Sequence, residues 1–284
     1  MRTWVVLFSI TLLLATVGCD SSIVVTNATL TKNAKAYYEA DLYDDALRLC
    51  DMLCKRQPGE YEPFALRCNI YSSMNNAEAA LRDADYLHDL FPHKLDVYRL
   101  RASICSSHGK HRQAIEDLQY VIKRTPDSCD NQIKLAHEFE QLGDYSKAID
   151  HLKTALSICD EDSTSWSNFS RILATSKKSE FRRGGPAKKC ASRAIKFSET
   201  DQERCQAWDS FGAALAESGD FTRAVKAANK ALEFTEDAKQ IETIEQHIKL
   251  YEQQQPVRHQ VSSEANEYWK ERPNQIGHDA MYSN

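Results

Sequence analysis

Apolar and polar positions alternate with helical spacing through most of this 284-residue chain. In residues 205–237, apolar side chains recur every three or four positions in two runs, which is the spacing of helices with one buried face. Gly219-Asp220 lies between the runs, where one helix ends and the next begins. The two faces consist of Trp208, Phe211, Gly212 and Leu215, and of Phe221, Ala224, Ala228, Ala231 and Leu232. This stretch is predicted to be a helical hairpin, which needs neighbouring copies because it cannot bury its own apolar faces.

The same pattern recurs along the chain with a period of 34 residues. Prolines follow apolar helical runs at this interval, where proline ends a helix: Pro58, Pro92 and Pro126. Alanines keep the period and continue beyond it: Ala46, Ala80, Ala114, Ala148, Ala187 and Ala224. Twelve positions before most of them stands another small residue: Ala34, Cys68, Ala102, Ala136 and Gly212. Small side chains at two fixed offsets are expected where antiparallel helices cross closely.

These residues resemble the tetratricopeptide repeat, whose pattern places Trp, Leu-Gly, Tyr, Ala, Phe, Ala and Pro at set offsets. The resemblance covers about three quarters of the chain. It implies an all-α, right-handed superhelical solenoid of about six helix–turn–helix repeats with a C-terminal capping helix. The repeats are expected at about 27–60, 61–94, 95–128, 129–162, 163–201 and 205–238. Residues 239–254, with Ile241, Ile244, Ile248 and Tyr251 on one face, are the predicted capping helix.

The fifth repeat contains an insertion at residues 177–186 that lengthens its turn. Its surroundings resemble a repeat variant in which the extended turn packs as part of the scaffold, on the basis of Ala174, Thr175, Arg182, Gly184 and Ala187. Five basic residues lie in or next to the insertion: Lys177, Lys178, Arg182, Arg183 and Lys188. Two interpretations stay open, a structural turn or a basic contact for an acidic partner or lipid headgroup.

Both ends of the chain differ from the repeats in composition. In residues 1–18, Arg2 precedes an apolar run too short to span a bilayer comfortably, which is typical of a secretory signal. Gly18-Cys19 resembles the processing site of bacterial lipoproteins, which implies a lipidated (palmitate-bearing) Cys19, although Thr16 stands where leucine is usual. The alternative is an ordinary signal peptide with an incidental cysteine. Residues 19–29 are predicted as a tether, 30–254 as the solenoid with its capping helix, and 255–284 as a polar tail, disordered or packed back on the solenoid.

Composition and spacing indicate no catalytic chemistry. A net charge of −5 with both signs interspersed argues against a nucleic-acid partner. Among nine cysteines a structural disulfide stays open, the most favourable pairing joining Cys50 or Cys54 to Cys68. The pairs Cys50-x3-Cys54 and His108-x2-His111 lack the second matched pair of a zinc site, so no metal is expected. Without a phosphate loop or a nucleophile elbow, we expect no enzyme, no cofactor and no small-molecule substrate.

The resemblance implies that the first helix of each repeat lines a concave groove for an extended peptide or a partner helix. By offset, the groove residues are Lys35, Tyr38, Asn69, Ser72, Arg99, Ser103, His137, Glu140, Arg171 and Glu217. The carboxylate clamp of chaperone-binding members is absent, because Ala65 stands where that clamp needs lysine.

Together these features predict an exported, lipid-anchored protein of the bacterial cell envelope, on the cell membrane or outer membrane and facing the periplasm. Its expected function is a non-catalytic scaffold for protein partners. The alternatives are a structural or assembly subunit of a membrane complex, and an accessory subunit of an envelope enzyme.

Overall fold

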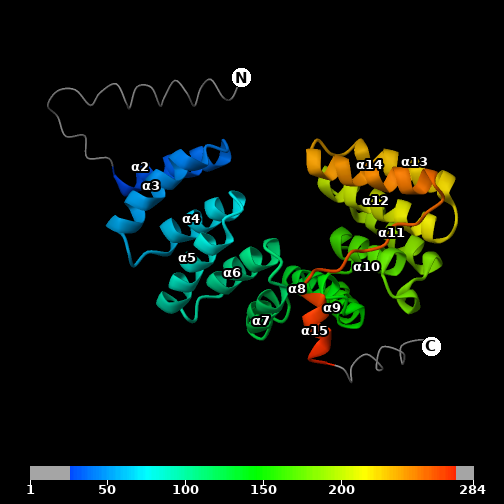
Figure 1. The fold of residues 1–284 in the computed structure, drawn as a ribbon, viewed down its shortest axis with the longest axis horizontal. Coiled ribbons are helices and arrows are strands. Elements are labelled where there is room, and N and C mark those ends of the chain that lie inside the picture. The colour runs from blue at the N-terminus through cyan, green and yellow to red at the C-terminus, as the bar shows by residue number, and fades with distance from the viewer. Residues whose placement is uncertain (1–25, 273–284) are drawn as a thin grey trace. The chain divides into compact units, whose positions relative to one another are not determined.

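The computed structural model describes residues 26–272, which consist of α-helices, one short 3-10 turn and their connections (Figure 1). The helices form consecutive hairpins without any strand in this range, which confirms the predicted all-α solenoid class. The chain divides into two compact units, residues 1–108 (unit 1) and 109–284 (unit 2). The predicted signal, residues 1–18, and Cys19 lie outside the described residues.

Unit 1 begins with a hairpin of two helices, followed by a second hairpin and a further helix. The elements are α2 (Asn27–Glu39), α3 (Tyr43–Arg56), α4 (Tyr61–Ser73), α5 (Ala77–Leu90) and α6 (Leu95–Ser107). Neighbouring helices bury a cluster of Ala34, Ala46, Cys50, Leu66 and Ile70. A second cluster joins Cys54, Phe64, Leu87 and Val97.

Unit 2 continues the same alternation and adds the capping helix and a short final helix. Its elements are α7 (His111–Ile122), α8 (Cys129–Gln141), α9 (Tyr145–Ile158), α10 (Ser163–Thr175), η1 (Ser179–Phe181), α11 (Gly184–Phe197), α12 (Asp201–Glu217), α13 (Phe221–Leu232), α14 (Ala238–Glu252) and α15 (Ala265–Lys270). We call α2, α4, α6, α8, α10 and α12 the first helices, since each opens a predicted repeat. The other helix of each repeat is its second helix.

The small residues at fixed offsets lie where paired helices approach most closely, as predicted. In unit 1 the Sγ of Cys68 on α4 donates to the main-chain oxygen of Ala80 on α5 at 3.4 Å. In unit 2 a Cβ added to Gly212 would lie 3.2 Å from the main-chain oxygen of Ala224. A larger side chain at either offset would push the helix pair apart.

The turn after most first helices contains one residue with left-handed backbone. These residues are Asp41, Asn75, Gly109, Gly143 and Gly219, with φ angles of 59°, 57°, 72°, 71° and 80°. The first four are spaced by the repeat period, and all are residue types that reach this conformation at low cost. The turn therefore contributes to the period alongside the helix faces.

Two predicted segments form as expected, and one boundary differs. The capping helix is α14, whose Ile244 and Tyr251 are buried in the last apolar cluster of unit 2. The insertion packs on α9, where the rings of Phe181 and Tyr145 lie 5.7 Å apart. The predicted tether ends earlier than residue 29, because α2 begins at Asn27 and the side chain of its N-cap accepts a hydrogen bond from a main-chain amide of the first turn.

The part of the polar tail that the structure describes, residues 255–272, packs on unit 2, which was one of the two predicted states of the tail. Figure 1 shows it leaving α14, passing along unit 2 and ending in α15 beside α8 and α9. From residue 26 to 272, no helix has the length and apolar character needed to cross a membrane.

Candidate functional site: the first helices and the docked tail

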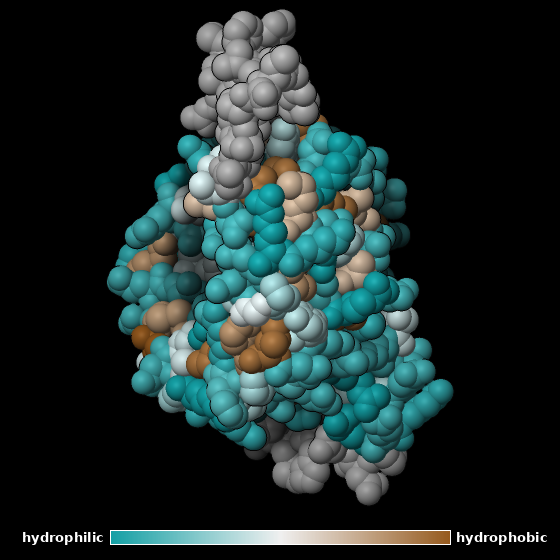
Figure 2. Space-filling view, turned by 90° about the vertical axis from the view of Figure 1, so that its left-hand side faces the viewer, coloured by the Kyte–Doolittle hydropathy of each residue, from teal (hydrophilic) through white to brown (hydrophobic). Residues whose placement is uncertain are grey.

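Six of the ten predicted groove residues lie on α2, α4 and α6 of unit 1, and all are exposed or half-exposed. We call this set the unit 1 row: Lys35, Tyr38, Asn69, Ser72, Arg99 and Ser103. Figure 2 shows one face of the molecule, where small apolar patches are separated by hydrophilic surface. In the described residues, the large apolar side chains that are most exposed all belong to unit 1: Leu42, Met52, Met74, Tyr86 and Leu90. The accessible surface of unit 1 is therefore mixed, with scattered apolar side chains among polar ones.

Side chains link neighbouring first helices of unit 1. The Nζ of Lys35 on α2 lies 2.5 Å from Oε1 of Glu62 on α4. The hydroxyls of Ser72 on α4 and Ser107 on α6 lie 3.3 Å apart. Arg99 forms an ion pair with Asp96 of its own helix, at 2.9 Å. The first two of these contacts join α2 to α4 and α4 to α6, the three helices that bear the unit 1 row.

The other four predicted groove residues, His137, Glu140, Arg171 and Glu217, lie in unit 2 and contact other parts of the same chain. Glu140 on α8 is only 1% exposed and accepts two hydrogen bonds from the Arg171 guanidinium on α10, at 2.5 and 2.7 Å. A buried carboxylate needs such a paired cation, since an unpaired one would be strongly destabilising. This pair fastens α8 to α10.

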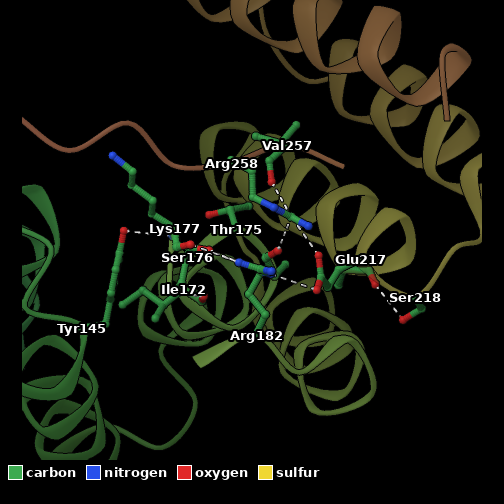
Figure 3. Close-up of polar contacts among 12 residues, drawn as sticks. Tyr145, Ile172, Thr175, Ser176, Lys177, Arg182, Glu217, Ser218, Val257 and Arg258 are labelled. Atoms are coloured by element: carbon green, nitrogen blue, oxygen red, sulfur yellow. Dashed lines mark hydrogen bonds and ion pairs between the residues drawn. The ribbon is translucent and has the colours of Figure 1, made fainter. Parts of the chain in front are cut away.

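Glu217, the last residue of α12, faces two arginines from different segments (Figure 3). Nε of Arg182, in the insertion, donates to Glu217 Oε1 at 3.2 Å. The guanidinium of Arg258, beyond the capping helix, lies 2.8 Å from Glu217 Oε2. Arg182 also donates to the main-chain oxygens of Ser176 and Lys177, at 2.9 and 3.2 Å. One carboxylate therefore joins a first helix, the insertion and the C-terminal segment.

The basic insertion is only partly available to a partner. Arg182 is engaged with α12, and the ammonium of Lys178 lies 4.6 Å from the ring centroid of Trp269. Lys177 and Arg183 are exposed. The structural-turn interpretation is thus confirmed, and a contact between the exposed basic residues and an acidic partner stays a prediction.

Residues 256–272, which we call the docked tail, run along the C-terminal ends of the first helices of unit 2. The main-chain amide of His259 donates to the oxygen of Thr175, the last residue of α10, at 2.8 Å. The amide of Ser262 donates to the oxygen of Gln141, the last residue of α8, also at 2.8 Å. Carbonyls at helix C-termini lack partners within their own helix, so they are ready acceptors for an extended segment.

Two aromatic residues of α15 anchor the far end of the docked tail. The hydroxyl of Tyr268 donates to Asp144 Oδ2 at 2.8 Å and lies 3.0 Å from Nζ of Lys147. Burial raises the pKa of Tyr268, so the phenol keeps its proton for this hydrogen bond. The indole Nε1 of Trp269 donates to the main-chain oxygen of Leu142 at 2.8 Å. Both anchors bind the turn between α8 and α9.

The docked tail also contacts the start of α7 and the glycine of the α8–α9 turn. The amide of Arg112 donates to Glu264 Oε2 at 3.1 Å, and its guanidinium forms an ion pair with Glu271. A Cβ added to Gly143 would lie 3.2 Å from Cγ1 of Val261. The glycine therefore provides both the left-handed turn and the space that the tail fills.

Two histidines lie close together where the docked tail passes α8: His137 on α8 and His259 in the tail itself. Burial lowers the pKa of both His137 and His259, and the positive charge of Arg171 acts in the same direction, against the opposing effect of Glu140. Both imidazoles are therefore neutral at pH 7. Nδ1 of His259 is buried without a hydrogen-bond partner.

The helical offsets identified the residues of the first helices and missed those that cover them. The aromatic pair Tyr268-Trp269, within a polar segment, was the one sequence signal for the docked tail. Arg258 and His259 have no such signal, since an isolated basic residue in a polar segment is usually solvated.

Within residues 26–272 the cysteines form no disulfide, which was one of the two outcomes left open by the sequence. All eight in the described residues are free thiols, including Cys50, Cys54 and Cys68. Burial raises the pKa of Cys50 to about 12 and that of Cys54 to about 11. These thiols stay protonated at neutral pH, whereas a nucleophile or a metal ligand must be a thiolate. Within residues 26–272, no three His, Cys, Asp or Glu side chains converge as a metal site.

Comparison with known families identifies one repeat directly. A tetratricopeptide-repeat model matches residues 131–162, which correspond to the predicted fourth repeat and contain α9 and most of α8. A search of curated proteins finds no match.

Solved structures extend the likeness to most of the chain. A tetratricopeptide repeat protein from Parabacteroides merdae is similar at 13% identity and a TM-score of 0.62, over 80% of this chain and 87% of that one. PilF of Pseudomonas aeruginosa is similar at 9% identity and a TM-score of 0.57, over 78% and 96%. Yeast Tom70 is similar at 12% identity and a TM-score of 0.58, over 91% of this chain and 50% of that one.

At these identities the structural likeness shows the fold alone. Together with the matched repeat, it defines the chain as a tetratricopeptide-repeat protein. That fold is generally a non-catalytic scaffold for protein–protein interaction.

Proposed function

We propose that this chain is a membrane-anchored, non-catalytic scaffold of the bacterial cell envelope that binds a partner peptide or helix along the unit 1 row. The observation that supports this most strongly is the contrast between the two units. The predicted groove residues of unit 2 lie near or beneath the chain's own tail, whereas those of unit 1 remain accessible on three adjacent helices. Mixed charge, hydroxyl and aromatic groups on such a surface suit a partner with both polar and apolar contacts.

The anchoring part of the proposal rests on the N-terminal sequence. A lipid on Cys19 after removal of residues 1–18 would hold the N-terminus of the solenoid at a membrane, facing the periplasm. Residues 20–26 are few and mix Asp, Ser and Thr with Ile23, Val24 and Val25, and they would form a short spacer between a lipid and the folded repeats.

A charge-reversal experiment tests the partner surface. The variant Lys35→Glu/Arg99→Glu changes two residues of the unit 1 row, and exposed charges of this kind contribute little to folding. We expect chemical cross-linking in native membranes, followed by mass spectrometry, to lose the partner that the wild type captures. The melting temperature should change by no more than a few degrees.

The matched control is Arg48→Glu/Arg82→Glu, which reverses two exposed arginines of the second helices α3 and α5. Each of these also has a local ion-pair partner, Asp45 or Glu78. Capture by this control should equal that of the wild type. Loss of the partner in the control, with retention in the row variant, would place the binding surface on the second helices instead.

A further inference from the structure

The docked tail uses three kinds of contact that any extended segment of similar chemistry could supply. Main-chain amides of the tail donate hydrogen bonds to the last carbonyls of α8 and α10. A guanidinium, that of Arg258, pairs with Glu217. An aromatic pair, Tyr268 and Trp269, binds the α8–α9 turn. The receiving groups all belong to the repeats, so this surface already functions as a peptide-binding site within one molecule.

Two apolar clusters of unit 2 are completed almost entirely by the repeats and the capping helix. The last core cluster is closed by Ile244 and Tyr251 of the capping helix, and only Val257 of the tail packs against it. The next cluster, around Leu173 and Ala214, includes no tail residue. From α10 to α14 the apolar core is therefore nearly complete without the tail, whereas Ala265 and Tyr268 of α15 are themselves buried. The extended part of the tail, which carries Arg258 and His259, binds a surface whose core is already packed.

Its fit to the surface is also incomplete. Nδ1 of His259 and the hydroxyl of Ser262 are buried without hydrogen-bond partners. Gln260, Ser263 and Asn266 are exposed. Each unsatisfied buried polar atom reduces the affinity of the tail, and so makes replacement by a better-matched segment easier.

We propose that the surface under the docked tail is a second binding site, and that an external extended segment displaces the tail from it. The chemistry of the tail defines the partner: an extended segment with an arginine for Glu217 and, about ten residues later, an aromatic pair for the α8–α9 turn. This inference rests on the proposed function, since it assumes that the chain binds protein segments.

The covalent link gives the tail an advantage that the partner must overcome. A short tether holds a segment near its site at an effective concentration on the order of millimolar. An external segment with the tail's own affinity would therefore bind weakly to the closed protein and much better once the tail is released. That difference is measurable with the tail sequence itself as the probe.

The test uses the full chain and a fluorescent peptide of residues 255–272. The variant Arg258→Glu/Trp269→Ala releases the tail, because it sets a carboxylate against Glu217 and removes the indole anchor. We expect the variant to bind the peptide at least about tenfold more tightly than the wild type. A peptide that carries the same two substitutions should not bind. Lys249→Glu, the same charge reversal on an exposed residue of α14, should behave as the wild type.

Hydrogen exchange decides the remaining outcomes. If the tail amides of the variant exchange freely and the peptide still binds no better than to the wild type, the surface is not a binding site. Unchanged protection of the His259 and Ser262 amides in the variant would also overturn the proposal, since the tail would then be a fixed part of the fold. If the variant loses helical structure, the wild type is used with excess unlabelled peptide. Faster exchange of its own tail then supports displacement, and unchanged exchange contradicts it.

This outcome is independent of the unit 1 experiment, because the probe is the chain's own peptide and no native partner is needed. Failure here leaves the unit 1 row as a candidate surface. If the tail peptide binds as expected and the unit 1 charge reversal leaves partner capture unchanged, the partner site would lie on unit 2.

Discussion

Arg67 shows how a single charged residue can connect three helices in a repeat core. Its guanidinium on α4 donates to both carboxylate oxygens of Asp83 on α5, at 2.7 and 2.8 Å, and to Asp51 on α3 at 2.7 Å. Asp83 is buried, so its carboxylate oxygens rely on this guanidinium for hydrogen bonds. The helical offsets do not reveal this network, because they describe apolar faces.

The variant Arg67→Met should therefore be strongly destabilising. It leaves the Asp83 carboxylate buried without its partner, which costs roughly 3–5 kcal/mol in comparable cases. Arg82→Met, at an exposed ion pair on α5, should cost less than about 1 kcal/mol. Urea denaturation measures both, and similar losses for the two variants would mean that Asp83 is not held by Arg67.

Docking of the tail should weaken as the pH falls. Burial lowers the pKa of His259 in the docked state, where it faces His137, Glu140 and Gln141 on α8, Arg171 and Thr175 on α10, and the ring of Tyr145 on α9. A released tail returns this histidine to an ordinary pKa near 6.5. Since the released state then binds the proton more readily, the docked state is fully favoured above about pH 6.5 and loses stability below it.

The measurement is amide exchange of the docked tail between about pH 7.5 and 5, corrected for the intrinsic pH dependence of exchange. We expect protection at His259 and Ser262 to decrease through this range while the helix amides of α12 and α13 keep theirs. The variant His259→Gln should lose most of this dependence, although His137 continues to titrate. His93→Gln, which changes an exposed histidine of unit 1, should retain it.

At the scale of elements, the small residues at fixed offsets mark where paired helices cross closely. Ala148 on α9 is fully buried, and Ala136 on α8 is only 2% exposed. A leucine at position 148 has no room without separating the two helices. The offset is thus a steric requirement, and composition alone does not express it.

Ala148→Leu should lower the free energy of unfolding by roughly 1–3 kcal/mol through overpacking. Ser146→Leu, two positions earlier on a half-buried part of the same helix, should change it little. Thermal or urea unfolding compares the two. Equal shifts would show that the offsets do not mark the helix crossing.

Elements also differ in how well local sequence defines them. The capping helix could be predicted from its own apolar face. The packing of the insertion could be predicted from its resemblance to a repeat variant with an extended turn. α15 is short, and its position depends on Asp144, Lys147 and Leu142, which are far away in the sequence. Its existence therefore could not be predicted from the six residues that form it.

At the scale of the whole molecule, the proposed lipid anchor determines where both binding surfaces would act. Cys19→Ala removes the acceptor of the lipid. We expect the variant either to leave the membrane fraction or to accumulate as an uncleaved precursor, because the lipid would be the group that holds the mature chain at the membrane. Fractionation and intact-mass measurement distinguish these results. Unchanged processing with unchanged membrane association would remove the lipoprotein part of the proposal.

Most of the fold could be predicted from the sequence because its information is local or strictly periodic. The helix faces, the turn residues and the small-residue offsets recur from one repeat to the next. Ala34, Ala46 and Gly212 occupy the buried positions that their spacing indicates. The accessible unit 1 row follows from the same offsets. A helix and its hairpin partner are adjacent in sequence, so their contacts leave a pattern that can be read directly.

The covered surface of unit 2 was decided only by tertiary structure. Its contacts join residues as far apart as Ala174 with Arg258 and Arg112 with Glu271, separations of 84 and 159 positions. Several acceptors, including those of Thr175, Gln141 and Leu142, are main-chain carbonyls, which every residue possesses and which carry no sequence signature. The sequence by itself therefore determined the repeats and the residues that face outward from their first helices. Which of those residues remain accessible depends on where the docked tail binds the main-chain carbonyls at the helix ends. Those carbonyls and the tail come together only in the folded chain.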